Sequence, residues 1–187
     1  MQRIELTLAI IKPHAVKNPV ALAHIRHVLR TKFVVVKTTR LHMDRELAAS
    51  FYQEHAGKFF HNRLVTFMSR SKKGMLCSAN VIRSGVSDVH VLGGVCAVSA
   101  WRSLLGPTRV SRASWWQPES LRALHGLSDT RNVAHGSDSE RAARREISFF
   151  FPRLLSWWAR EGASYCGPLS FSRTDFQHSP AYSPRTH

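Results

Sequence analysis

A histidine–glycine pair stands directly before a predicted helix, in the segment His135 to Ser139. Neutral imidazole is a competent nucleophile near neutral pH, and Gly136 leaves the space beside the ring free of side-chain bulk. The N-terminus of the helix would point unpaired N–H groups and a positive dipole end at an approaching phosphate. The segment therefore suits a histidine that carries a phosphoryl group.

Such a histidine needs an acceptor for its second ring nitrogen, and Glu146 is the candidate. It flanks an apolar stripe of the following predicted helix, formed by Ala143, Ile147 and Phe150. Its carboxylate is therefore expected to face inward and to require a partner. Taken singly, such positions are more often an ordinary loop histidine and a surface glutamate.

Residue types that commonly bind phosphate occur in several other segments. They are Lys12, Arg102, Thr108, Arg122 and Asn132. Two arginine forks, a lysine and a hydroxyl group could clamp a diphosphate and stabilise charge during transfer. Each of them alone is more often a solvated side chain, so the hypothesis depends on a fold that brings them together.

The first elements that must position these residues are two strands and a helix. Glu5 to Ile11 and the β-branched Phe33 to Leu41 are typical of strands. The helix between them is expected to begin with Asn18 as N-cap and Pro19 as first residue. Its apolar residues recur at helical spacing over Val20 to Leu29.

A second group of elements follows. Asp44 is predicted to cap a helix that Gly57 ends, and His61 to Met68 is predicted to be a short helix. Arg70 to Arg83 has no period and is predicted to be a basic, mobile loop. The alternation of Val86 to Leu92 predicts a third strand.

The last elements surround the histidine. Cys96 to Leu105 is predicted to be a helix, and Thr108 to Ser120 an irregular segment. A short apolar approach leads to His135. Ser137 and Glu140 then fit a capping box, with serine at the N-cap.

The order of these elements predicts an α+β fold, a ferredoxin-like sandwich with a four-stranded antiparallel sheet. The domain is expected to cover residues 1–152 because Pro152 stops the last helix. Residues 153–187 have no hydrophobic period and are rich in Pro, Ser and Gly. They are predicted to form a partly disordered extension.

The chain is strongly basic, with 27 Lys and Arg against 12 acidic residues and a net charge of +15. Such a field attracts nucleotides, nucleic acid or anionic lipid. No apolar run is long enough to span a membrane, and no signal peptide is recognised. The three cysteines are scattered, which supports neither a zinc site nor a disulfide scaffold. The cytoplasm is the default location, with mitochondria as the alternative.

Five segments, in order, resemble the nucleoside diphosphate kinase family: IIKPHAV, FYQEHAGKFF, WRSLLGPT, ESLRALHG and RNVAHGSDS. The likeness covers roughly Leu6 to Pro152, and RNVAHGSDS is the most specific of the five. A divergent branch of the family shares GPTRV and a last helix that ends in FFP. The resemblance implies ping-pong transfer of the γ-phosphate of ATP to a nucleoside diphosphate through phosphohistidine.

The resemblance also assigns roles to residues. The catalytic set would be His135, Glu146, Ser137, Lys12 and Tyr52. The nucleotide-binding set would be Lys12, Phe60, Arg102, Thr108, Arg122 and Asn132, with Phe60 stacking on the base. Mg²⁺ would be held by the nucleotide phosphates rather than by protein ligands.

The sequence departs from the family at several places. His14 replaces an aspartate in the turn after Lys12, and Ala123 replaces a glycine after Arg122. Residues 70–83 are an insertion of about 14 residues, which costs little closure entropy, roughly 0.6 kcal/mol per doubling of loop length. Gly93 and Gly94 are expected to weaken the link between a strand and the next helix.

Three functions remain open at this point. The first is an active kinase acting on ATP and other nucleoside triphosphates and diphosphates. The second is a catalytically weak nucleotide-binding protein of the same fold that works as a regulatory partner or homo-oligomer. The third is a basic nucleic-acid-binding module, which the net charge permits.

Overall fold

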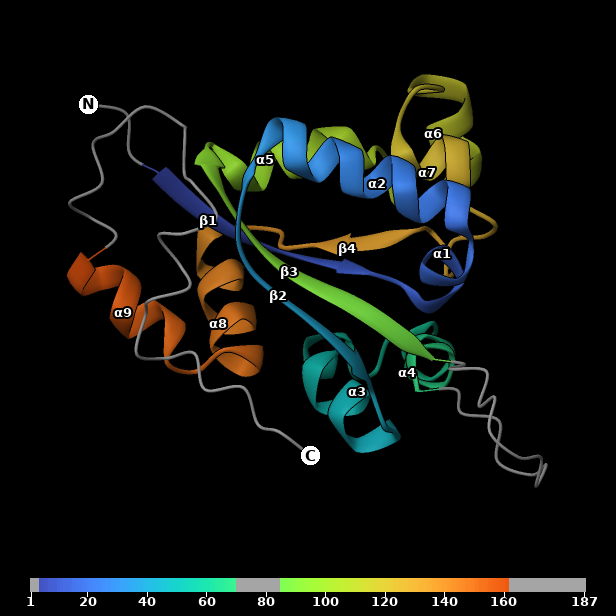
Figure 1. Ribbon diagram of the computed structural model, residues 1–187. Coiled ribbons are helices and arrows are strands. Elements are labelled where there is room, and N and C mark those ends of the chain that lie inside the picture. Colours follow the sequence, from blue (N-terminus) through green and yellow to red (C-terminus); the bar gives the residue numbers. More distant parts are fainter. Residues whose placement is uncertain (1–3, 70–84, 162–187) are drawn as a thin grey trace, which may run out of the picture.

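The computed structural model describes residues 4–69 and 85–161 of the 187-residue chain. Four strands form an antiparallel sheet in the order β2-β3-β1-β4 (Figure 1). They are β1 (Ile4–Ile11), β2 (Val34–His42), β3 (Val86–Val95) and β4 (Ala134–Gly136). The predicted ferredoxin-like α+β class is therefore confirmed.

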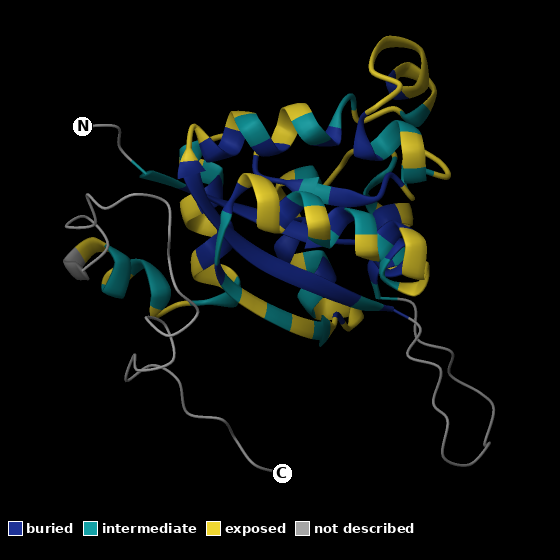
Figure 2. Ribbon diagram, turned by 45° about the horizontal axis from the view of Figure 1, so that its top comes forward, coloured by how far each residue is buried: buried dark blue, intermediate teal, exposed yellow. Residues whose placement is uncertain are grey.

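Helices cover both faces of this sheet, so the strands are buried while the outer sides of the helices are exposed (Figure 2). In β1, Ala9 and Ile11 pack with Trp101 in a cluster that also contains residues of the helices Pro19–Lys32 and Ala97–Leu105. Leu8 and Ile10 belong to the cluster on the opposite face, because side chains alternate along a strand. The helices are α1 (Pro13–Lys17), α2 (Pro19–Lys32), α3 (Arg45–Phe51), η1 (Gln53–His55), α4 (His61–Met68), α5 (Ala97–Leu105), α6 (Val110–Trp116), α7 (Leu121–His125), α8 (Glu140–Phe150) and α9 (Leu154–Glu161).

Two of the predicted caps are confirmed. The Asn18 side chain accepts hydrogen bonds from the N–H groups of Val20 and Ala21, and α2 begins at Pro19. The Asp44 carboxylate accepts from the N–H of Leu47 at 2.7 Å. Both caps satisfy N–H groups that have no partner within their own helix.

The predicted end of α3 at Gly57 is wrong. The helix ends at Phe51, and a short 3₁₀ segment, η1, carries the chain to Gly57, which turns it with φ +82°. This left-handed conformation favours glycine. Gly57 therefore shapes the turn into α4 rather than capping α3.

The prediction of an irregular segment over residues 108–120 is also wrong, since Val110–Trp116 forms α6. Only Ala113 of this helix is buried, so the segment has no apolar stripe from which a helix could be predicted. Its first N–H group, that of Val110, donates to the carboxylate of Asp129 at 3.1 Å. The helix is thus capped by a residue that comes later in the chain.

The strand β3 continues through both glycines that were expected to weaken it. A Cβ atom at Gly93 would lie 3.3 Å from the Val36 side chain, and one at Gly94 would lie 3.5 Å from Phe33. The glycines therefore permit close packing on the two faces of the sheet. The turn into α5 is made instead by Cys96, whose φ is +51°.

The first part of the predicted extension is helical. Leu154, Leu155 and Trp158 of α9 pack against the core cluster that contains α8, and α9 lies beside α8 (Figure 1). The predicted loop over 70–83 and the remainder of the extension lie outside the described residues. No helix in the described ranges is long and apolar enough to cross a bilayer.

Candidate active site

His135 lies on β4, the edge strand that pairs with β1, and its Cα is opposite that of Ile10. Its carbonyl accepts a hydrogen bond from the indole of Trp101 at 3.2 Å. A Cβ atom at Gly136 would lie 2.7 Å from the same indole. Gly136 is therefore required by the packing of Trp101, and not only to leave space beside the imidazole.

A buried carboxylate holds one nitrogen of the imidazole. His135 Nε2 lies 2.9 Å from Glu146 Oε2, and the side chains are 17% and 5% exposed. Burial alone would raise the pKa of Glu146, but His135 and the Ser137 hydroxyl bring it below its ordinary value. An ionised carboxylate accepts only, so Nε2 carries the proton and Nδ1 keeps its lone pair.

Ser137 is part of this arrangement rather than a helix cap. Its hydroxyl donates to Glu146 Oε2 at 2.7 Å and accepts from the N–H of Leu8 at 3.2 Å. The N-cap of α8 is Ser139, which accepts from the N–H of Ala142. The predicted capping box at Ser137 is therefore wrong, because that hydroxyl is committed to the buried carboxylate.

Lys12 occupies the inner end of the cleft. Its ammonium donates to Asn132 Oδ1 at 2.7 Å and to the carbonyl of Thr130 at 3.0 Å. The amide of Asn132 donates in turn to the carbonyl of Thr108 at 3.1 Å. Burial, and secondarily the charge of Arg122, lowers the pKa of Lys12 to about 7.

Arg122 is held by backbone carbonyl groups. It donates to those of Gly106 at 2.6 Å, Ala134 at 3.2 Å and Asn132 at 3.3 Å. Burial, then the nearby Arg102, lowers its pKa to about 10. The side chain thus ties together three segments around the cleft as well as contributing positive charge to it.

Arg102 and Tyr52 complete the polar lining. The guanidinium of Arg102 forms an exposed ion pair with Asp138. The buried Tyr52 hydroxyl has no hydrogen-bond partner among the described residues, and its ring centroid lies 6.2 Å from that of His135. Burial, and then Glu146, raises the pKa of Tyr52, so its hydroxyl remains a proton donor.

One cavity of about 540 Å³ collects most of the predicted residues. It is lined by Lys12, Tyr52, Phe60, Arg102, Thr108, Arg122, Asn132 and His135. Ser137 and Glu146 are not in its lining; Glu146 holds His135 by a hydrogen bond, and Ser137 holds Glu146. All ten predicted site residues therefore belong to one connected site.

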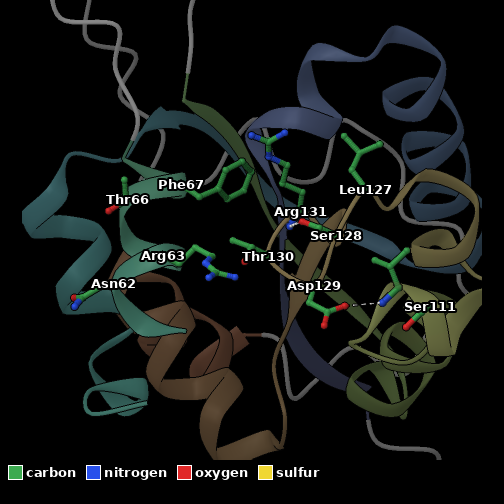
Figure 3. Close-up of a pocket in the computed structure, with 11 residues that line it drawn as sticks. Asn62, Arg63, Thr66, Phe67, Ser111, Leu127, Ser128, Asp129, Thr130 and Arg131 are labelled. Atoms are coloured by element: carbon green, nitrogen blue, oxygen red, sulfur yellow. Dashed lines mark hydrogen bonds between the residues drawn. The ribbon is translucent and has the colours of Figure 1, made fainter. Parts of the chain in front are cut away.

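The cavity also contains residues that the sequence did not single out. His55, Arg63, Asp129 and Asp138 line it as well. An adjoining cavity of about 1020 Å³ shares Arg63, Asp129 and Thr130 with it (Figure 3). His55 and Asp138 lie within two of the recognised segments, whereas Arg63 and Asp129 lie just outside them, and charged residues of this kind are common on any surface.

The replacement of aspartate by His14 is accommodated by a specific contact. His14 Nε2 accepts from the N–H of Val133 at 3.3 Å, and the carbonyl of Val133 accepts from the N–H of Lys12 at 2.9 Å. Val133 has φ +76°, which is strained for a β-branched residue. Burial, then the charges of Lys12 and Arg131, lowers the pKa of His14 to about 4. The ring is therefore neutral and able to accept.

The change to Ala123 is harmless to the backbone. The residue lies inside α7, and it is not among the residues with positive φ. Its N–H donates to the hydroxyl of Ser120, the N-cap of that helix, at 3.4 Å. Alanine is favoured over glycine in such a position.

The described residues contain no group of three or more His, Cys, Asp or Glu side chains arranged to hold a metal ion. The lining of the cavity contains more cationic side chains than carboxylates, which are those of Asp129 and Asp138. This composition suits a polyanion that brings its own divalent cation.

Comparison with known proteins agrees with this geometry. The family model "Nucleoside diphosphate kinase" matches residues 5–154. The chain is 41% identical to human "Nucleoside diphosphate kinase 6", over 91% of this chain and 87% of that protein. It is 40% identical to the mouse protein of the same name, over 96% and 90%.

Solved structures give the same result. The nucleoside diphosphate kinase of Aquifex aeolicus superposes with a TM-score of 0.68 at 29% identity, covering 80% of this chain and 96% of that one. The enzyme of Halobacterium salinarum in complex with CDP superposes with a TM-score of 0.63 at 28% identity, covering 80% and 88%.

Proposed function

Because the chain belongs to the nucleoside diphosphate kinase family, we propose that it transfers the γ-phosphate of ATP to nucleoside diphosphates through phosphohistidine at His135. The observation that carries the proposal is the 2.9 Å contact between His135 Nε2 and a buried, ionised Glu146. It leaves Nδ1 as the nucleophile, in a cavity whose lining includes five lysine and arginine side chains.

In the first half-reaction, Nδ1 attacks the γ-phosphorus of ATP. An N–P bond forms, the bond to the β,γ-bridging oxygen breaks, and ADP leaves with the electron pair. The imidazole becomes positively charged as it reacts, and the Glu146 carboxylate stabilises that charge through the Nε2 proton. In the second half-reaction, a terminal oxygen of a nucleoside diphosphate attacks the phosphohistidine and regenerates neutral imidazole.

The cationic side chains hold the phosphates during both steps. Lys12 and Arg102 would contact phosphate oxygens directly, while Arg122 fixes the backbone around them and adds its charge. The Tyr52 hydroxyl is a proton donor at the same cavity. Mg²⁺ would be held by the nucleotide phosphates and not by protein ligands, and it would neutralise part of their charge.

Phe60 would receive the base at the other end of the cleft. It stands at the start of α4, and its ring contacts that of His55 at 5.5 Å between centroids. Stacking does not require a particular base, because every base has a π-face. The predicted role of Phe60 thus fits transfer to several acceptor nucleotides.

The test is formation of a phosphoenzyme from ATP labelled at the γ-phosphate, followed by transfer of the label to added diphosphates. His135→Gln should abolish labelling while leaving the circular dichroism spectrum unchanged. His27→Gln, at an exposed histidine of α2, is the matched control and should label normally. Undiminished labelling of the His135 variant would overturn the proposal.

A second candidate function is that of a catalytically weak partner protein, and one observation favours it. Trp115 and Trp116 of α6 are 84% and 71% exposed. Exposed large aromatic side chains commonly mark protein contacts. A homo-oligomer or a regulatory complex would cover them, and the phosphoenzyme assay separates this function from the first.

A further inference from the structure

A cationic side chain lies close to the carboxylate that holds His135. Glu146 directs one oxygen, Oε2, to His135 and to the Ser137 hydroxyl, at 2.9 Å and 2.7 Å. Its other oxygen, Oε1, lies 3.7 Å from Nη2 of Arg145, the preceding residue of α8. This separation is longer than a hydrogen bond, so Arg145 acts on Glu146 through its charge.

Arg145 is held in this place by a partner from another element. The same nitrogen, Nη2, lies 2.7 Å from Oε2 of Glu54, which belongs to η1. The side chains of Glu54 and Arg145 are 59% and 43% exposed, whereas that of Glu146 is 5% exposed. The ion pair of Glu54 and Arg145 therefore joins η1 to α8 at the surface and stands beside a buried carboxylate.

The groups that face Glu146, among the residues that the structure describes, come from four segments. They are Tyr52 at the end of α3, His135 of β4, Ser137 in the loop before α8, and Arg145 of α8 itself. Burial, and then Glu146, raises the pKa of Tyr52, which therefore stays neutral. Burial alone would raise the pKa of Glu146, but His135, Ser137 and then Arg145 lower it. Arg145 is thus the permanent positive charge of this group.

We propose that Arg145 is a positioning residue for the phosphoryl transfer proposed above, and that its charge keeps an additional proton off the His135–Glu146 pair. The two groups share a hydrogen bond, so they titrate as a pair. An additional proton would occupy either Nδ1 of the imidazole or the carboxylate. The first state has no nucleophile, and the second has no charge to stabilise the reacting imidazole. A fixed positive charge nearby makes both states less favourable.

Glu54 determines how close the guanidinium stays to Glu146. Without this partner, a side chain as exposed as that of Arg145 would gain rotamer freedom and turn toward solvent. Neither Glu54 nor Arg145 is among the residues that line the cavity of His135. Their replacement should therefore change the pH dependence of transfer and leave the affinity for nucleotide unchanged.

The experiment measures the rate of phosphoenzyme formation from labelled ATP, at saturating nucleotide, from about pH 5 to about pH 9. Arg145→Gln removes a positive charge and so raises the proton affinity of the pair. The acid limb of the profile should move to higher pH by about half a unit, with about a threefold lower rate on that limb. Arg145→Lys keeps the charge and should recover most of the shift. Arg144→Gln, which breaks the exposed pair with Glu140 on the same helix, is the matched control and should leave the profile unchanged.

A charge exchange separates the charge of Arg145 from a purely mechanical tie between η1 and α8. Glu54→Arg combined with Arg145→Glu keeps an ion pair between the two segments but places a negative charge beside Glu146. The acid limb should then move further to higher pH, by about one unit. If the exchange instead restores the wild-type profile, the tie alone matters and the proposal is overturned.

Carbon-13 NMR titration of the Glu146 carboxyl group tests the same charge without any transfer. The signal of this group is identified by its absence from Glu146→Gln. The pKa of Glu146 should be higher in Arg145→Gln than in the wild type and in Arg144→Gln. An unchanged pKa and an unchanged rate profile would overturn the role of Arg145 and leave the kinase activity standing. A raised pKa in a protein that forms no phosphoenzyme would overturn the kinase activity and leave the electrostatic role of Arg145 standing.

Discussion

The inner and outer ends of the cleft are built differently. At the inner end, Lys12 and Asn132 are buried and joined by a 2.7 Å hydrogen bond, and Arg122 is tied to three carbonyl groups. At the outer end, Arg63 and Asp129 are exposed and form no ion pair with another described residue. The groups that would meet phosphate are thus fixed before a nucleotide arrives, whereas the side chains at the outer end are exposed to solvent.

This difference separates two tasks. Preorganised charges stabilise a transition state without reorganising, so changes at the inner end should alter the rate of phosphoryl transfer. Exposed groups are screened by water and contribute less. Changes at the outer end should therefore alter mainly the affinity for nucleotide.

The largest effect is expected at the carboxylate behind His135. Glu146→Gln keeps the shape but removes the charge that stabilises the reacting imidazole, so phosphoenzyme formation should slow about hundredfold. Rapid-quench measurement with labelled ATP checks this. Glu46→Gln, on the exposed first turn of α3, should react like the wild type. A normal rate for Glu146→Gln would show that the charge of Glu146 does not stabilise the reacting imidazole.

Next in size is the pH dependence of nucleotide binding. The pKa of Lys12 is lowered from 10.5 to about 7 in the free site, so above that pH the amine is mostly neutral. Bound phosphates favour the ammonium form, so binding takes up a proton. Affinity should then fall about tenfold per unit as the pH rises above 7.

Calorimetry in buffers of different ionisation enthalpy measures this proton uptake. It should be small at pH 6 and approach one proton per nucleotide at pH 8. Lys12→Arg binds through a group that stays charged, and should bind without the uptake. Equal uptake in the wild type and the Lys12→Arg variant would exclude Lys12 as the titrating group.

The strained turn at Val133 should give a smaller effect. His14→Ala removes the acceptor for the N–H group of Val133. It should lower the free energy of unfolding by about 1–2 kcal/mol and slow phosphoryl transfer several-fold. His14→Gln places an amide oxygen near the former Nε2 and should restore most of both. If glutamine is as damaging as alanine, the hydrogen bond is not what positions the turn.

The smallest effect is expected at Phe60. Phe60→Ala should raise KM several-fold and leave the rate of phosphoenzyme formation at saturation nearly unchanged, because stacking is lost only at the outer end. A similar truncation at Phe59, which lines the same cavity but is 93% exposed, should change KM less. A large drop in kcat for Phe60→Ala would show that the outer end of the cleft also controls the rate of phosphoryl transfer.

Local signals in the sequence were sufficient for several features of this fold. Asn18 and Asp44 cap their helices through N–H groups two or three residues away, so each cap could be recognised from its own segment. The strand and helix periods likewise predicted where the strands and most of the longer helices lie along the chain. The resemblance then identified residues from five segments that do meet around one cavity.

Features that depend on distant partners could not be recognised in this way. Ser137 has the composition of a helix cap, but its hydroxyl is held by Leu8, far away in the sequence, and by Glu146. The helix α6 is capped by Asp129, which follows it. In the sequence, His14 is only the replacement of an aspartate, because its partner, the N–H of Val133, comes near it only in the folded chain.

The contact between Gly136 and Trp101 has a consequence for how sequences of this kind can diverge. Since a methyl group at position 136 would collide with the indole at 2.7 Å, neither position can change alone without loss of fitness. A homologous sequence with a larger residue at 136 must carry a smaller one at 101. Positions 101 and 136 should therefore change together among related sequences, with a larger residue at one accompanied by a smaller residue at the other.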